Sequence, residues 1–332
     1  VGDIFEDRGP GSHWSDGSKK TILYGYARWL GFIKTAEPDA LDLAPEKRVT
    51  PERVLRYVEL LQGSISPAGT QNYVKHLNFA TRVMAPGEDW RWLHELALRL
   101  EKLVTPRNKR PRMVSSHELV DLGLKLMADA EDATEAPDIK DIERAILYRD
   151  GLMIALLASR PIRRRNLAGI RIGVNLLIDP TGYRLQFAEH ETKTHTVLEH
   201  PLPDWLVPYT NCYLEYYRLI FPGAVDHDGL WASVKGGPLR SEGIYDRIIL
   251  RTKEAFGHSV NPHLFRDCVA TTIAHEDPEH VHIAADLLGH ASLEFTQRHY
   301  IQSQTREACV TYQGTLEVIR HSLKQNDQGR RD

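Results

Sequence analysis

Cysteine is scarce in this chain, and long runs of apolar residues are missing from it. The 332 residues include three cysteines, Cys212, Cys268 and Cys309, which are too few and too dispersed for a disulfide framework or a zinc site. A reducing cytoplasm fits this cysteine usage best. No run of about 18 or more apolar residues occurs, so we expect no membrane partner. The first 20 residues are rich in Gly, Ser and Asp and lack the apolar core of a signal peptide.

The chain also lacks the excess of positive charge that is typical of nucleic-acid-binding proteins. Its net charge of −3 argues by itself against such a partner. The charge is unevenly distributed, however, because residues 1–113 carry a balance of +4 and residues 114–332 a balance of −7. Seven acids lie between Asp129 and Glu143, a run that is typical of a solvated loop or helix face, with a regulatory or partner-binding role as the alternative. A basic surface is therefore compatible with the acidic total.

The remaining composition is that of an ordinary globular protein, with 42% hydrophobic and 26% charged residues. The length suggests two domains, each large enough for its own core. The patterns below predict a mainly α fold with a small antiparallel β-sheet, the sheet belonging to an α+β second domain. The predicted boundaries are a flexible segment 1–17, a helical domain 18–103, a basic linker 104–114, a larger domain 115–323 and a polar tail 324–332.

Four short helices are predicted in the first domain. They cover residues 18–33 with Ser18 as the cap, a segment that opens at Thr50 and Pro51, about residues 69–84, and about residues 90–103. Apolar stripes of this kind most often form a core, so the pattern alone indicates a helical bundle.

The segment between the domains is basic and contains no acid. Five cations lie among two prolines here: Lys102, Arg107, Lys109, Arg110 and Arg112, with Pro106 and Pro111. Prolines keep the segment extended, and its cations favour a polyanion with an affinity that falls with salt. A solvated hinge without contacts is the alternative.

The second domain combines helices with three strands. A capping box at Ser115–Glu118 opens a helix, and a helix over 139–158 leads to Arg163. Strands are predicted at 169–178, 183–188 and 196–201, with Lys193 in the second turn. Helices then follow at 203–221, 241–256, 263–275, 279–288 and 292–303, and a last apolar segment at 304–323 packs in its own domain or on a neighbouring subunit.

Six side chains of the second domain form one chemically coherent set: Arg163, Lys193, His263, Arg266, His290 and Tyr300. Guanidinium groups bind two phosphate oxygens at once and stay charged, so two arginines can hold a phosphodiester without a metal. A tyrosine hydroxyl becomes an effective nucleophile when a neighbour accepts its proton. Histidine can accept that proton, and lysine can protonate the departing oxygen. The set therefore predicts phosphodiester cleavage without a metal or another cofactor.

The order of these residues resembles that of the phage integrase family of tyrosine recombinases. Residues 159–167 are similar to its first arginine motif, with Arg163 in the catalytic place, and residues 191–193 to its β-hairpin lysine. Residues 261–266 resemble its His-x-x-Arg motif, and residues 287–290 and 296–300 its most recognisable signature. The similarity spans about residues 115–310, with a looser likeness before them. A lone His-x-x-Arg occurs by chance in many proteins, so the weight rests on five motifs in order.

Two departures from the family pattern are present. Asn166 stands where members usually carry an acidic residue that supports the first arginine, so we expect a neutral hydrogen bond to hold Arg163 instead. Ten residues separate His290 from Tyr300, where nine is common. Position 299 is a histidine, so Tyr300 is assigned as the nucleophile.

The resemblance implies a DNA strand-exchange enzyme that acts through a 3′-phosphotyrosyl link. Its partner would be double-stranded DNA with paired recombination sites, bound by a homotetramer at the nucleoid in the cytoplasm. Residues 18–103 would be the core-binding domain and residues 115–323 the catalytic domain, acting in integration, excision or transposition of a mobile element. The expected contacts to the DNA backbone are Lys75, Arg107, Lys109, Arg110, Arg112, Arg164 and Arg165.

Two other functions and one other kind of site are alternatives to this interpretation. A type IB topoisomerase uses a similar residue set, and a DNA-binding accessory protein with a degenerate site is a further alternative. His275, His280, His282 and His290, interleaved with acids, superficially resemble a metal site. Their spacing is poor for one, because His280 and His282 fall on different faces of a helix.

Overall fold

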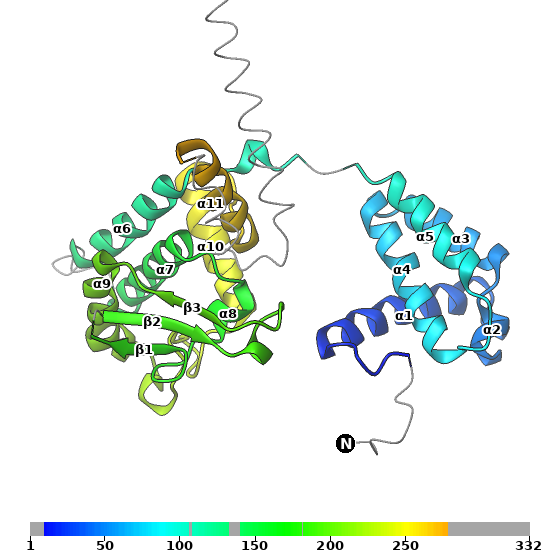
Figure 1. The fold of residues 1–332 in the computed structure, drawn as a ribbon, viewed down its shortest axis with the longest axis horizontal. Coiled ribbons are helices and arrows are strands. Elements are labelled where there is room, and N and C mark those ends of the chain that lie inside the picture. Colours follow the sequence, from blue (N-terminus) through cyan, green and yellow to red (C-terminus); the bar gives the residue numbers. More distant parts are fainter. Residues whose placement is uncertain (1–9, 106–107, 133–139, 181, 278–332) are drawn as a thin grey trace, which may run out of the picture. The chain divides into compact units, whose positions relative to one another are not determined.

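The computed structural model describes residues 10–105, 108–132, 140–180 and 182–277. The chain divides into two compact units, Val1–Asn108 and Lys109–Asp332. Figure 1 shows both units. The division between them falls within the basic segment 104–114.

The first unit is a helical bundle. Its elements are α1 (Asp16–Ala36), the 3₁₀ turn η1 (Pro38–Asp42), α2 (Pro45–Arg48), α3 (Pro51–Gln62), α4 (Pro67–Met84) and α5 (Arg91–Lys102). Thr50 caps α3 as predicted, because its side chain accepts a hydrogen bond from the backbone of Arg53. The predicted cap at Ser18 is wrong: the Ser15 side chain accepts from the backbone of Ser18, at 3.2 Å.

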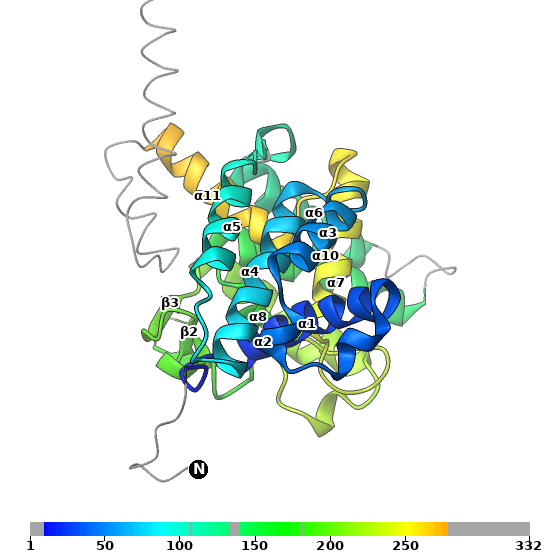
Figure 2. The same ribbon diagram turned by 90° about the vertical axis from the view of Figure 1, so that its right-hand side faces the viewer.

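The core of this bundle is built from one face of each long helix. Trp29, Tyr57, Leu77 and Leu93 are buried in it. Helix α1 crosses α4 (Figures 1 and 2). At the crossing Gly25 admits His76, since a Cβ on Gly25 would lie 2.5 Å from the Cβ of His76. The predicted helical bundle is confirmed.

The second unit is organised around a buried helix. Its helices are α6 (Ser116–Asp132), α7 (Asp141–Ser159), α8 (Arg164–Ala168), α9 (Val207–Cys212), α10 (Ser241–Phe256) and α11 (Pro262–Glu276), with the 3₁₀ turn η2 (Arg110–Arg112) before them. Helix α7 is buried over most of its length and contacts α6, α10 and α11. Figure 1 shows α6 and α7 side by side.

Two glycines allow α6 and α7 to touch through their backbones. A Cβ on Gly123 would lie 2.7 Å from the carbonyl oxygen of Gly151, and a Cβ on Gly151 would lie 2.6 Å from that of Gly123. Real Cβ atoms do not approach a backbone oxygen so closely, so any side chain here would push the helices apart. This contact fixes α7, and α7 leads directly into the segment that carries Arg163.

A buried ion cluster joins α7 to α10. The fully buried carboxylate of Asp150 accepts hydrogen bonds from Arg247 (2.6 and 2.8 Å), Arg251 (3.0 Å) and Arg149 (3.0 Å). Arg149 also donates to the carbonyl of Ala232 at 2.7 Å. One buried acid thus accepts from three guanidinium groups, of which that of Arg149 is buried and those of Arg247 and Arg251 are partly exposed.

The sheet is small and antiparallel, in the order β1 (Leu176–Asp179), β2 (Gly182–Phe187), β3 (Leu198–Pro201). The predicted first strand was too long at its start, because residues 171–175 turn tightly there, with Gly173 at φ 75°. The predicted helix over 203–221 is divided into the 3₁₀ turn η5 (Asp204–Leu206), α9, a π-helical turn over Tyr213–Tyr217 and the 3₁₀ turn η7 (Arg218–Ile220). The predicted fold class is confirmed.

Candidate active site

Arg163 lies in the connection between the buried helix α7 and the short helix α8. It occupies the N-cap position of α8, and its side chain is half-buried. Three residues earlier, the Nε of Arg160 donates to the carbonyl of Pro201 at 2.8 Å, which ties this connection to β3. Partial burial lowers the pKa of Arg163 from its ordinary value. Arg163 therefore belongs to a connection that is tied to β3, and its side chain is not fully extended into solvent.

Arg266 approaches the same place from α11. Asn261 caps this helix by accepting from the backbones of His263 and Leu264, both at 3.0 Å, and Arg266 follows one turn later. Its side chain is buried, and Nη1 donates to the carbonyl of Pro161. Burial, followed by the charge of Arg163, lowers the pKa of Arg266 to about 10. The two guanidinium groups therefore act on each other, and both remain charged at neutral pH.

His263 lies three residues before Arg266 and is open to solvent. Partial desolvation lowers its pKa, the carboxylate of Asp267 raises it, and the cations Lys109, Arg266 and Lys193 lower it further. The net direction is downward, so the imidazole is neutral at pH 7 and can accept a proton. The influence of Lys193 also places that lysine within electrostatic range of His263.

Lys193 lies exposed in the turn between β2 and β3. The base of this turn is closed by Thr192, whose buried side chain donates to the carbonyl of Thr196 at 2.8 Å and accepts from its backbone N–H at 3.1 Å. His195 adopts a left-handed conformation at φ 53° in the same turn. The position of Lys193 is thus set by a hydrogen-bonded turn and not by packing of its own side chain.

Asn166 connects the arginine-bearing helix with the lysine-bearing turn. It is buried, and its amide donates to the carbonyl of Glu191 at 3.1 Å. The Glu191 carboxylate in turn accepts from the side chain of Asn175 and from the backbone of Ala188. The expected support of Arg163 by Asn166 stays a prediction, whereas this link to the turn was not anticipated from the sequence.

The predicted DNA-contacting residues are placed in different ways. Arg164 and Arg165 are exposed on α8, and the Cζ of Arg164 lies 5.3 Å from the ring centre of Tyr245. Lys75 is exposed on α4 in the first unit. Lys109 forms an ion pair with Asp267 at 2.7 Å, while Arg110 and Arg112 lie in η2. Their contacts to DNA stay predictions.

Three predicted residues lie outside the described part of the chain. They are His290, Tyr300 and Arg107. Of the six catalytic candidates, the structure therefore describes four, Arg163, Lys193, His263 and Arg266, and these four belong to one electrostatic cluster.

Sequence reasoning missed His200, a buried residue of β3. It is 8% exposed, and burial, followed by the charges of Arg160 and Arg266, lowers its pKa to about 4. No motif marks this position. The available signal was its place in a predicted strand that follows Lys193, where alternate residues face the core.

The described residues contain no group of three or more His, Cys, Asp and Glu side chains that could hold a metal ion. Of the four histidines in the competing constellation, His275 is described. Within the described ranges, no helix is both long and apolar enough to cross a bilayer.

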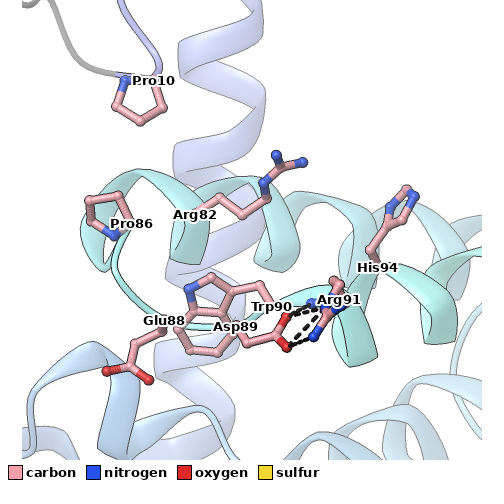
Figure 3. A pocket seen from close by; sticks show the side chains of 8 residues that line it. All are labelled: Pro10, Arg82, Pro86, Glu88, Asp89, Trp90, Arg91 and His94. Atoms are coloured by element: carbon pink, nitrogen blue, oxygen red, sulfur yellow. Dashed lines mark hydrogen bonds and ion pairs between the residues drawn. The ribbon is translucent and has the colours of Figure 1, made fainter.

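A cavity of about 430 Å³ lies in the first unit. None of the residues that line it is a predicted catalytic residue. Figure 3 shows its lining, in which Asp89 accepts hydrogen bonds from Arg91 at 2.6 to 3.0 Å. Trp90 contributes its indole to the wall, with Nε1 donating to the carbonyl of Ala85 at 2.8 Å. The exposed carboxylate of Asp89 competes with any anion for the guanidinium group of Arg91, so this cavity is unsuited to binding an anion.

A sequence-family model described as the phage integrase family matches residues 130–307, which include all six candidate positions. No curated protein matches the chain. Several solved structures are similar to it, among them the following two. The XerH site-specific recombinase bound to difH substrate, in a pre-cleavage complex, aligns with a TM-score of 0.57 at 16% identity, over 88% of this chain and 78% of that one. A lambda integrase(75–356) dimer bound to a COC′ core site aligns with a TM-score of 0.51 at 19% identity, over 86% and 90%. At such identities the structural likeness bears on the fold.

Proposed function

The chain belongs to the phage integrase family of tyrosine site-specific recombinases, and from this premise we propose that it cleaves and rejoins DNA strands through a 3′-phosphotyrosyl intermediate. The observation that carries the proposal is the pair of arginines that two separate elements bring together, Arg163 from the start of α8 and Arg266 from α11. Arg163 and Arg266 are close enough for the charge of one to lower the pKa of the other. The two guanidinium groups repel each other, and an anion bound between them would remove that repulsion. Such a pair at a partly open site therefore favours anion binding.

The chemistry proposed for this site is an in-line displacement at phosphorus. The Tyr300 oxygen forms a bond to the phosphorus while the bond to the 5′ oxygen breaks, which leaves a 3′-phosphotyrosyl link and a free 5′-hydroxyl. Arg163 and Arg266 neutralise charge on the non-bridging oxygens. His290 helps these arginines to stabilise the transition state. Because the phosphodiester energy is retained in the protein link, the reverse attack by a 5′-hydroxyl rejoins strands without ATP.

Two proton transfers accompany this displacement. The neutral imidazole of His263 is able to accept a hydrogen bond or the proton of the tyrosine, which its lowered pKa supports. Lys193 protonates the departing 5′ oxygen. Its charge acts on the pKa of His263, which supports a place for Lys193 in the same site.

The proposed substrate is double-stranded DNA with paired recombination sites, bound by a homotetramer at the nucleoid. The proposed setting is integration, excision or transposition of a mobile element. The similar XerH and lambda integrase structures hold a difH substrate and a COC′ core site, respectively, which supports DNA as the partner here.

The deciding experiment uses nicked suicide substrates prepared from DNA fragments that the protein selects from a random pool. The wild-type chain is expected to form a covalent protein–DNA adduct that survives denaturation. Tyr300→Phe removes the nucleophilic oxygen and is expected to abolish the adduct, while Tyr312→Phe, the matched control, retains it. An unchanged adduct in Tyr300→Phe contradicts the proposed nucleophile.

A second assay separates recombination from related reactions. Exchange between two plasmid-borne sites supports the proposal, whereas relaxation of supercoils without paired sites assigns the chain to topoisomerase-like chemistry. Binding without any strand cleavage assigns it to an accessory role.

A further inference from the structure

The segment that enters the second unit lies along α11, the helix that carries His263 and Arg266. Three contacts hold it there: Lys109 to Asp267 at 2.7 Å, the backbone N–H of Ser116 to the Thr272 hydroxyl at 3.0 Å, and His117 to Glu276 at 2.8 Å. The partners on α11 are spaced five and four residues apart and are reached in chain order. We call residues 109–117 the α11 strap.

Asp267 is the buried end of the first contact. Its side chain is 3% exposed, whereas that of Lys109 is 43% exposed. A carboxylate so deeply buried needs a counter-charge, because the interior solvates it poorly. Lys109 supplies that charge at hydrogen-bonding distance, from 158 positions away in the chain.

The placement of Asp267 on the helix makes the contact relevant to the active site. It follows Arg266 directly and lies four residues after His263, on the adjacent turn of the same face. Movement of Asp267 therefore moves the backbone that carries both catalytic candidates.

We infer that Lys109 and Asp267 form a positioning pair through which the α11 strap holds His263 and Arg266 in their cleavage geometry. This inference rests on the proposed function for its catalytic part. It assigns to Lys109 a role inside the catalytic unit, in place of the DNA-backbone contact expected from the sequence. An ammonium group has three N–H donors, so the contact with Asp267 does not by itself prevent Lys109 from binding a phosphate, and the experiments below separate the two roles.

The electrostatics of His263 give the pair a signature of its own. The charged groups that act on this histidine are Asp267, which raises its pKa, and Lys109, Arg266 and Lys193, which lower it. Removing the lysine charge should therefore raise the pKa of His263, and removing the carboxylate charge should lower it. General loosening of α11 would reduce the partial desolvation of the ring and shift the pKa of His263 in the same direction in both variants.

The first experiment follows the His263 ring by NMR as pH is varied, in the full-length chain without DNA. Lys109→Met is expected to raise the titration midpoint and Asp267→Asn to lower it, with the double variant between them. Arg112→Met removes one cation from the same strap and serves as the matched control, with an unmoved midpoint. Equal or same-direction shifts in the two single variants overturn the inference.

The second experiment measures single-turnover adduct formation on the suicide substrate. Each single variant is expected to slow cleavage about tenfold, whereas the double variant should be far less than a hundredfold slower, because the second change removes an interaction already lost. Lys109→Arg keeps the charge and should restore most of the rate. Additive losses, or a loss in Lys109→Met that saturating DNA fully reverses, assign Lys109 to DNA binding instead.

The two experiments keep the two proposals apart. If the wild-type chain forms no adduct, the proposed function fails, and the titration still decides whether the pair controls His263. If the adduct forms and the titration midpoints do not move in opposite directions, the positioning pair fails and the proposed function stands.

Discussion

The Asp150 cluster offers the most direct test of how the second unit is held together. Replacing Asp150 with alanine leaves three guanidinium groups without their shared acid. Arg247, with a side chain 26% exposed, can turn toward water, and Arg251 retains Glu254 at 3.1 Å. Arg149 can neither reach water nor keep a second acid, because its side chain is 3% exposed and Asp150 is its acidic partner.

The expected loss follows from that single trapped cation. Breaking a buried ion pair by removing one partner costs about 3–5 kcal/mol, a large part of the roughly 5–15 kcal/mol that stabilises a typical domain. Asp150→Asn retains the shape and one acceptor oxygen, and should cost about 1.5–3 kcal/mol through weaker hydrogen bonds.

The measurement is urea unfolding followed by hydrogen exchange of peptides from α7 and α10, which reports on the second unit alone. Asp129→Ala is the matched control within the same unit: it removes the 3.0 Å bond to Lys125, but this pair lies at the surface, where water replaces the lost partner. A loss below about 1 kcal/mol in Asp150→Ala would refute the reasoning, since it would mean that water reaches Arg149.

Two further predictions concern packing and pH. His200 resists protonation in the folded state, with a pKa of about 4 against an ordinary 6.5, so the wild-type chain should lose about 3 kcal/mol of stability as pH falls from 6.5 to 4, at about 1.4 kcal/mol per pKa unit. Acid unfolding of His200→Gln should lack this contribution, and an identical pH dependence in both chains would contradict it. Gly151→Ala should cost about 1–3 kcal/mol by forcing α6 and α7 apart. Gly31→Ala on α1, where a Cβ meets no atom within 4 Å, should stabilise by about 0.5–1 kcal/mol. Thermal melts of each variant measure both changes. Equal effects of the two glycine changes would show that the close contact carries no weight.

Local signals predicted the starts of several helices. Thr50–Pro51 and Ser115–Glu118 carry their own capping chemistry, so they were found in the sequence and are confirmed by hydrogen bonds at those residues. The cap at Ser18 was placed three residues late, because Ser15 and Ser18 are equally good capping residues and the backbone decides between them. The fold class followed from the same periodicities.

Long-range partners were beyond such reasoning. Lys109 and Asp267 lie 158 positions apart, and the charge of Arg266 lowers the pKa of His200 only because the fold brings these two residues within electrostatic range. No feature of the neighbouring sequence distinguishes the buried Asp150 from an acid on the solvated face of a helix. These contacts depend on how the elements pack, which one sequence does not encode in any short window.

The Gly123–Gly151 contact has a consequence for how this gene can change. Any single-base replacement of a glycine codon that alters the amino acid introduces a Cβ, and at either position that atom would collide with a carbonyl oxygen of the opposing helix. No mutation of one member creates room for a side chain on the other. Every amino-acid replacement at either glycine therefore disturbs the contact between α6 and α7. Selection against such replacements acts through α7, the helix that leads to Arg163.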